Sequence, residues 1–422
     1  MSVFTDRLFK IVNQRYPECT ISNQAAFFPM HTLDGGDLST TAAVEIARGT
    51  KQRAEKVADT LIADLAQSFN IEQPGVNWRN DKGYIVALGT SGRALLSEVS
   101  GDVQAAIRRI DINPIATNGD VHSVWCLLPD STEPVYARLR ILARATLQGL
   151  LAVTYCGSAE LCVLPHAPAK VSSQTEVLDL FRKAVLWVLN HHDEVRRDVD
   201  LPEGSSCLSV WTSHHYHEKL AAATKNKLQD IKRSHRTRVI MPTDGWLLSR
   251  DRALAEILEP KALKRVLDRV VGHDGWRRLL FHLASTTPSG DFDPAVALFD
   301  ECSSPLWGSR ELANRHARFF GAPLALSSLD PEGLSFHEVA SYRKLALCGL
   351  FMPVYTARAI LHNQIETWCL SLERLVREGH AFINAPMTRA QLEQGSTGGG
   401  CAQIAASLGF GLSCILPLVA EE

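Results

Sequence analysis

The chain has 422 residues, of which 45% are hydrophobic and 21% are charged, and its formal net charge at pH 7 is −2. This composition is typical of a globular protein with about two to four domains. The small net charge excludes a basic surface spread over the whole molecule, so any nucleic-acid surface must be a local patch. The ten cysteines form no CxxC pair, which favours free thiols over disulfides or a zinc site. We expect a cytoplasmic protein, because the sequence shows neither a signal peptide nor an uninterrupted apolar run of about 18 residues.

The first segment, residues 1–112, has the pattern of a small α+β domain. Apolar residues recur at helical spacing in 4–16 and again in 54–65, and Ser39 or Thr40 can cap a helix between them. The short runs 76–79 and 84–88 are expected to form a hairpin across an Asp/Gly link, and a further helix is expected at 95–107. Four basic residues cluster near the start of the second helical stretch: Arg48, Lys51, Arg53 and Lys56.

This segment resembles the additional N-terminal domain of arginyl-tRNA synthetases. The resemblance rests on Gly36-Asp37 and Ser39 before a helix, and on Gly83-Tyr84-Ile85 before the last strand, in the order found in the family. In that family the domain binds the elbow of tRNA. The resemblance therefore implies tRNA contacts at the four basic residues and at Tyr84, whereas the alternative is an ordinary solvated helix surface.

The middle segment, residues 113–290, is typical of an α/β domain. The β-branched and aromatic run 121–128 predicts a buried strand, a proline-rich turn follows it, and a helix is expected from Val135. On this helix Leu139, Leu142, Ala143, Thr146 and Leu150 fall on one face, and Arg140, Arg144 and Gln148 fall on another. Further strands are expected at 209–211 and 238–241, further helices at 176–190 and 253–271, and a turn with an N-cap at 170–173.

The strand, turn and helix at 121–153 resemble the first unit of a Rossmann-like class I synthetase core. The family carries a Pro-Leu-His-Val-Gly-His element there, which binds ATP phosphates, whereas this chain has Pro-Val-Tyr-Ala-Arg-Leu at 134–139. The second activating element of the family is Lys-Met-Ser-Lys, and its best counterpart by position, 283–291, contains no lysine or arginine. Because both losses affect the same ATP chemistry, we expect a degenerate core that forms no adenylate and holds no cofactor.

The middle segment also contains a basic stretch and two histidine-rich clusters. Seven basic residues and one acidic residue lie between 219 and 238, and Lys227, Lys232, Arg233 and Arg236 are candidates for phosphate contacts. A solvated helix face is the alternative. The clusters at 191–194 and 213–218 lack matched ligand pairs at helical spacing, so we expect no metal centre.

The last segment, residues 291–422, is predicted to be helical. Apolar residues recur at intervals of three and four at 361, 365, 368, 372 and 375, and the same rhythm returns at 401–415. Residues 303–320, which include His316-Ala317-Arg318, and the closing stretch 401–419 resemble the DALR anticodon-binding domain. That resemblance implies contacts with the anticodon stem and loop from Arg315, His316, Arg318 and Arg358. Trp368 is a further candidate that we assign to the core, and an unrelated helical interaction domain is the alternative.

The three segments follow one another in the order found in arginyl-tRNA synthetases, which implies an α/β plus all-α protein. We expect a catalytically degenerate relative that binds tRNA, with arginine tRNA implied, and presents it to a partner such as a tRNA-modification enzyme, without binding DNA or a membrane. One alternative is an enzyme that uses charged arginyl-tRNA to form a peptide or cyclodipeptide, with Tyr136, Glu160 or His166 as candidate catalytic residues. The other is a structural subunit of a ribonucleoprotein or protein complex.

Overall fold

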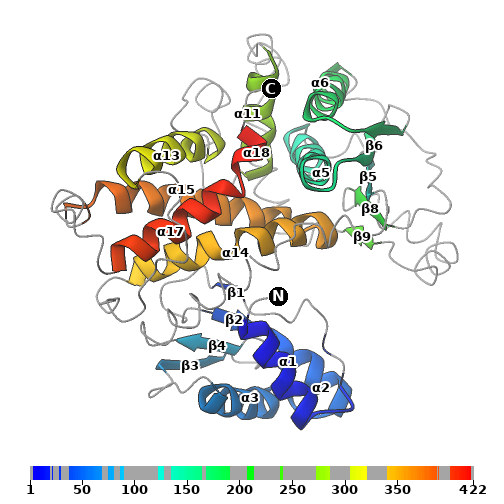
Figure 1. Ribbon diagram of the computed structural model, residues 1–422. Helices are drawn as coiled ribbons and strands as arrows, with labels where there is room; N and C mark the ends of the chain where they lie inside the picture. The colour runs from blue at the N-terminus through cyan, green and yellow to red at the C-terminus, as the bar shows by residue number, and fades with distance from the viewer. Residues whose placement is uncertain are drawn as a thin grey trace, which may run out of the picture. The chain divides into compact units, whose positions relative to one another are not determined.

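The computed structural model describes twenty helices and strands and the residues beside them (Figure 1). The described residues are 3–19, 21, 28–29, 38–68, 75–79, 86–89, 122–127, 135–163, 168–190, 207–212, 238–240, 272–285, 305–320, 340–386, 388 and 400–419. The predicted helices at 95–107 and 253–271 lie outside them. The chain divides into two compact units: unit 1 contains Met1–Asp111, Leu312–Val354 and Arg374–Ile415, and unit 2 contains Ile112–Glu311, Tyr355–Glu373 and Leu416–Glu422. The predicted third segment is therefore divided between the two units.

The N-terminal part of unit 1 combines three helices with a small antiparallel sheet. The helices are α1 (Val3–Arg15), α2 (Ala42–Thr50) and α3 (Ala54–Ser68), and the strands are β1 (Phe28–Pro29), β2 (Leu38–Thr40), β3 (Gly75–Arg79) and β4 (Val86–Gly89). The sheet order is β1-β2-β4-β3. Helix α3 packs on β3 and β4 and also contacts α1 and α2. The predicted pairing of the two short runs is confirmed, since Trp78 lies opposite Ala87. The Thr40 hydroxyl accepts a hydrogen bond from the Ala42 N–H (3.1 Å), so Thr40 assists the start of α2.

Unit 2 contains a mostly parallel sheet of five strands. These are β5 (His122–Leu127), β6 (Ala159–Val163), β7 (Ala169–Val171), β8 (Cys207–Thr212) and β9 (Arg238–Ile240), in the order β7-β6-β5-β8-β9. Strands β6, β5, β8 and β9 pair in parallel and β7 is antiparallel to β6. The predicted strand at 121–128 and the helix from Val135 are confirmed by β5 and α5 (Val135–Cys156). Helices α6 (Gln174–Asn190) and α11 (Gly272–Ser285) pack on α5, and Figure 1 shows α5 and α6 on the same side of the sheet.

Helix α5 is buried over almost its whole described surface, and this corrects the two-faced pattern predicted from the sequence. Arg140 is 4% exposed and Gln148 is 1% exposed, although both lie on the predicted polar face. The physical reason is that α5 packs on β5, β6 and β8 and also contacts α6 and α11. A helix that is covered on several sides must bury its polar stripe as well, and each buried polar group then needs a hydrogen-bond partner.

The C-terminal helices are α13 (Pro305–Phe320), α14 (Ala340–His362), α15 (Ile365–Asn384), α17 (Gly400–Ser413) and α18 (Leu416–Val419). The predicted apolar face is buried at Ile365, Trp368, Leu372 and Leu375. The face is not on one helix, however, because Asn363 has a left-handed backbone (φ 60°) and separates α14 from α15. Within unit 1, α14 and α17 approach closely, since a Cβ added at Gly349 would lie 2.2 Å from the Ser407 carbonyl oxygen.

Two further expectations bear on the environment of the protein. The seven cysteines whose state the structure describes are free thiols, as expected. The stretch Lys344–Leu361 of α14 has the length and hydropathy of a membrane span, but most of it is buried within the protein. A core helix of a soluble protein has the same properties, so the stretch is weak evidence for a span.

Candidate nucleic-acid interface

The most exposed group of predicted tRNA-binding residues lies where α2 ends and α3 begins. Arg48, Lys51, Arg53 and Lys56 are all exposed, and we call them the α2–α3 basic cluster. None of these side chains forms a hydrogen bond or ion pair within the part of the chain that the structure describes. Four exposed cations on two connected helix ends can contact phosphate groups without first breaking another interaction.

The position of Lys51 follows from the way α2 ends. Lys51 is the C-cap residue, with φ 56° and ψ 28°, and its backbone N–H donates to the Ala47 carbonyl. This left-handed conformation is usually taken by glycine and costs a residue with a Cβ about 1 kcal/mol. A lysine here keeps a positive charge beside the carboxyl end of the helix dipole and turns the chain toward α3.

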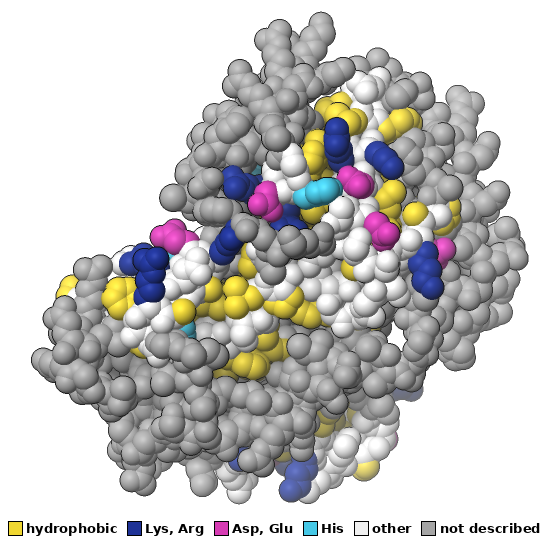
Figure 2. Space-filling model, turned by 45° about the horizontal axis from the view of Figure 1, so that its top comes forward, with side chains coloured by type: hydrophobic (Ala, Val, Ile, Leu, Met, Phe, Trp, Pro, Cys, Tyr) yellow, Lys and Arg dark blue, Asp and Glu magenta, His cyan; other side chains and the backbone are white. Residues whose placement is uncertain are grey.

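Acidic residues on the same helices reduce the local charge only in part. Glu45 and Glu55 are half-buried, whereas Asp59 is exposed. The exposed side chains around the α2–α3 junction are therefore mainly cationic. On the face shown in Figure 2, by contrast, the described Lys and Arg side chains are interspersed with Asp and Glu.

The predicted anticodon-binding residues divide into exposed and buried groups. Arg318 is exposed and Arg315 is half-buried. The Arg315 guanidinium donates to Asn384 Oδ1 (2.6 Å) and lies 3.4 Å from His380 Nδ1, so it joins α13 to α15 within unit 1. Arg315 and Arg318 thus remain candidates at the surface of these helices.

His316 and Arg358 correct the sequence-based prediction, because both side chains are buried. His316 is 5% exposed, and its Nε2 donates to the Ala405 carbonyl at 2.7 Å. Burial lowers the pKa of His316, although that hydrogen bond opposes the shift. Arg358 is 8% exposed and donates to Gln364 Oε1 at 3.2 Å, and its pKa is lowered to about 10 by burial. Both residues pack the helices and are not available to RNA in this structure.

The assignment of Trp368 to the core is confirmed. Its side chain is fully buried, its indole N–H donates to the Thr356 hydroxyl at 3.0 Å, and its ring packs against Phe281 with a centroid separation of 5.9 Å. A tryptophan in this position cannot stack on an RNA base.

Two described side chains in the first turns of α5 are buried. Arg138 is 1% exposed and Leu139 is also buried. Strand β5 lies at the centre of the sheet, and the strands that follow it in the chain lie first on one side of it (β6 and β7) and then on the other (β8 and β9). Open α/β sheets bind ligands at such a reversal of strand order. The guanidinium side chain of Arg138 lies buried in the first turns of α5.

Deeper in unit 2, Gln148 joins the helix to the sheet. Its side-chain oxygen accepts a hydrogen bond from the Trp211 indole N–H at 2.7 Å, and its amide donates to the Ile360 carbonyl at 2.8 Å and to Asn363 Oδ1. Sequence reasoning missed this network, because its members come from β8, α5 and the α14–α15 junction. These polar groups have a structural role.

Of the candidate catalytic residues of the transferase alternative, the structure describes the side chain of Glu160, and the roles of Tyr136 and His166 stay predictions. Glu160 on β6 accepts a short hydrogen bond from the Ser123 hydroxyl (2.6 Å). Tyr136 lies in the first turn of α5, and His166 lies outside the described residues. The neighbouring Cys162 is no ready nucleophile, since burial, with a contribution from Glu160, raises its pKa to about 12.

The remaining predicted RNA-binding residues lie outside the described residues: Tyr84, Lys227, Lys232, Arg233 and Arg236. Their roles stay predictions. The described residues also contain no group of three or more histidine, cysteine or acidic side chains that could hold a metal ion.

Comparison with known proteins finds similarity to solved structures. No family model matches the sequence, and no curated protein is significantly similar to it. Among solved structures, the fold is similar to the crystal structure of arginyl-tRNA synthetase from Plasmodium falciparum, with a TM-score of 0.44 and 10% sequence identity over 99% of this chain and 98% of that chain. A similarity at this level does not assign the chain to a family, a substrate or a reaction.

Proposed function

We propose that this protein binds tRNA through its N-terminal α+β part and presents the tRNA to a partner without activating an amino acid. The observation that carries the proposal is the α2–α3 basic cluster, whose four cations are exposed and unpaired within the described residues. Phosphate contacts of this kind provide most of the affinity and fix the orientation of a nucleic acid, but they do not select a sequence.

The choice of tRNA rests on the sequence resemblance. Three segments resemble, in order, the N-terminal domain, the Rossmann-like class I core and the DALR bundle of arginyl-tRNA synthetases. That order favours an arginine tRNA as the ligand. A partner such as a tRNA-modification enzyme would supply the chemistry that this chain lacks.

The absence of amino-acid activation is proposed from the start of α5. The family's two histidines and glycine are replaced by Tyr136, Leu139 and Arg138, respectively. Neither a leucine nor a tyrosine can donate a charged hydrogen bond to a phosphate as a histidinium does. The buried Arg138 side chain also takes up volume that a glycine would leave open.

The proposal is tested by isolating the protein from its host after crosslinking and sequencing the RNA that accompanies it. We expect enrichment of tRNA, with an arginine isoacceptor first, and no ATP–pyrophosphate exchange by the purified protein with arginine. Consumption of charged tRNA with release of a peptide or cyclodipeptide would favour the transferase alternative. Recovery of protein partners without tRNA would overturn the proposal in favour of a structural subunit.

A further inference from the structure

A second basic surface lies in the groove between α1 and α3, and sequence reasoning did not identify it. The groove has a volume of about 730 Å³, and its polar lining includes Arg7, Lys10, Gln14 and Arg15 from α1 and Asp64 and Gln67 from α3. The lining thus contains three cationic side chains and one carboxylate. Ile11 is the one apolar residue of the lining.

Two interactions hold the cations at the ends of the groove. The Arg7 guanidinium donates to the Ser68 carbonyl at 3.2 Å, at the carboxyl end of α3. The Arg15 guanidinium donates to Asp64 Oδ1 at 3.1 Å. The Arg15 guanidinium keeps further N–H donors after its contact with Asp64, because an arginine carries five. The contacts with Ser68 and Asp64 restrict the Arg7 and Arg15 side chains, so these side chains lose less conformational entropy when a ligand binds.

Lys10 lies between Arg7 and Arg15 in the sequence of α1, and its side chain is exposed. It forms no hydrogen bond or ion pair within the described part of the chain. Because a helix rises about 1.5 Å per residue, the backbone positions of Arg7 and Arg15 are about 12 Å apart along α1. A row of cations of that length is longer than one phosphate group and suits a run of consecutive phosphates.

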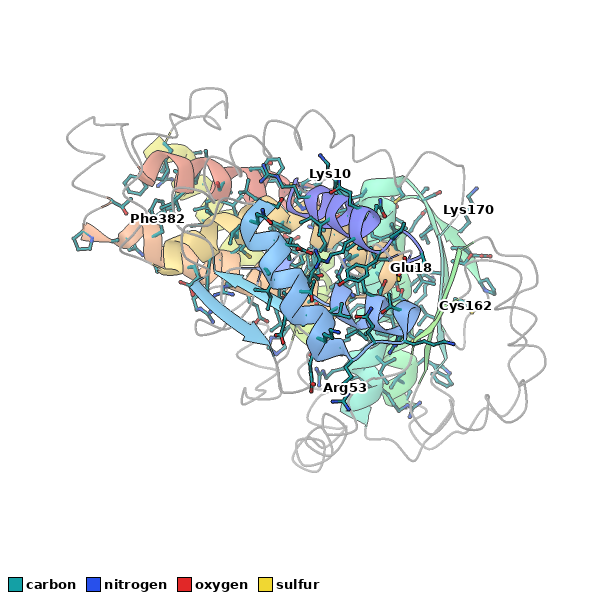
Figure 3. All side chains as sticks on the ribbon, turned by 90° about the horizontal axis from the view of Figure 1, so that it is seen from below. Lys10, Glu18, Arg53, Cys162, Lys170 and Phe382 are labelled. Atoms are coloured by element: carbon teal, nitrogen blue, oxygen red, sulfur yellow. The ribbon has the colours of Figure 1, made fainter. Side chains whose placement is uncertain are left out.

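We infer that the α1–α3 groove binds the phosphate backbone of an RNA strand. The inference rests on the proposed function, since it names a second contact surface for the same ligand class. Figure 3 shows Lys10 and Arg53 on opposite sides of the helices of the N-terminal part, so the groove and the α2–α3 basic cluster are separate contacts. The side-chain amides of Gln14 and Gln67 add neutral donors to the phosphate oxygens.

The test compares two substitutions in the groove that act in opposite directions. Lys10→Glu reverses the charge of the exposed lysine. Asp64→Asn removes the one carboxylate of the lining and keeps an oxygen that can accept the Arg15 hydrogen bond. Lys183→Glu, an exposed charge reversal on α6 in unit 2, is the matched control. Fluorescence anisotropy with the full-length chain measures affinity for a short oligouridylate and for arginine tRNA at several salt concentrations.

We expect Lys10→Glu to weaken oligouridylate binding and to lower the slope of log K against log salt by about 0.7, the value for one phosphate contact on a single strand. Asp64→Asn is expected to tighten binding, and Lys183→Glu to leave it unchanged. A substitution that merely disturbs folding cannot produce this opposite pair of effects.

The outcomes separate this inference from the proposed function. If tRNA binds the wild type and both groove variants equally well, the groove is not a contact surface and the proposed function stands. If oligouridylate binding depends on Lys10 but tRNA binds no more tightly than oligouridylate, the groove is supported and tRNA recognition is overturned. If neither RNA binds, both are overturned.

Discussion

The N-terminal α+β part exposes the side chains of its α2–α3 basic cluster, whereas the α/β part around α5 buries two of its arginines. On α3 the cation Lys56 is exposed, whereas Arg138 and Arg140 on α5 are 1% and 4% exposed. A buried guanidinium is tied to the packing of its own unit, because an unpaired buried charge is costly. An exposed cation has no such burial cost and can contact a phosphate group. The number of arginines in a segment therefore says little about RNA binding until their burial is known.

The largest expected effect concerns the buried polar network of unit 2. Gln148→Ala removes the partner of the Trp211 indole and two further hydrogen bonds and leaves a cavity. We expect the free energy of unfolding to fall by about 3 to 5 kcal/mol, measured by urea denaturation. Gln67→Ala, at an exposed position on α3, is the control and is expected to change stability by less than about 0.5 kcal/mol. Equal losses in the two variants would contradict a structural role for Gln148.

A pH effect is expected from His282 on α11, whose pKa is lowered to about 4 by burial. Between pH about 6.5 and about 4, the unfolded chain binds a proton at this histidine and the native chain does not. Stability therefore falls as the pH decreases through this range, by up to about 3 kcal/mol, and does not fall further from this group below the native pKa. Urea denaturation from pH 7.5 to 4 is expected to show a smaller decrease for His282→Gln than for the wild type. Identical pH profiles would rule out this contribution.

Substitutions in the α2–α3 basic cluster are expected to change tRNA binding and not stability. The double substitution Arg53→Glu and Lys56→Glu is expected to leave the unfolding free energy nearly unchanged, because both side chains are exposed. It is expected to weaken tRNA binding and to lower the salt slope by about 2, or about 1 for each phosphate contact. The control is the same pair of charge reversals at the exposed residues Arg182 and Lys183 on α6. If both double variants lose the same affinity, the effect is one of net charge and the cluster has no special role.

The smallest expected effect separates binding from stability at a single residue. Lys51→Gly relieves the left-handed backbone (φ 56°) and is expected to raise the unfolding free energy by about 0.5 kcal/mol. The same substitution is expected to lower the salt slope of tRNA binding by about 1. Lys51→Asn, which tolerates the same backbone without the charge, should bind tRNA as weakly as the glycine variant. Wild-type affinity in both variants would exclude Lys51 from the interface.

The sequence predicted those elements whose signal is local. The strand β5 and the start of α5 follow from an apolar run and a proline-rich turn. The turn predicted at 170–173 is correct only in part, because 170 and 171 belong to strand β7. After the strand, Ser173 and Glu176 cap each other: the Glu176 N–H donates to the Ser173 hydroxyl, and the Ser173 N–H donates to the Glu176 carboxylate. The break at Asn363 was missed, because the apolar spacing continues across it without a change in period.

Burial and long-range proximity were the properties that the sequence did not reveal. The polar stripe of α5 looked exposed, because periodicity within one helix carries no information about the helices that cover it. His316 and Arg358 were misjudged for the same reason. The α1–α3 groove was missed because Lys10 and Asp64 are far apart in sequence and come together only when α1 packs on α3.

The most direct test of the contrast between exposed and buried cations is to map where RNA contacts the protein. Full-length protein is crosslinked to arginine tRNA by ultraviolet light, digested, and analysed by mass spectrometry. We predict crosslinked peptides from residues 42–68, which contain α2 and α3, and none from residues 135–156 of α5. Crosslinks confined to other parts of the chain, or a crosslinked peptide from α5, would contradict the account.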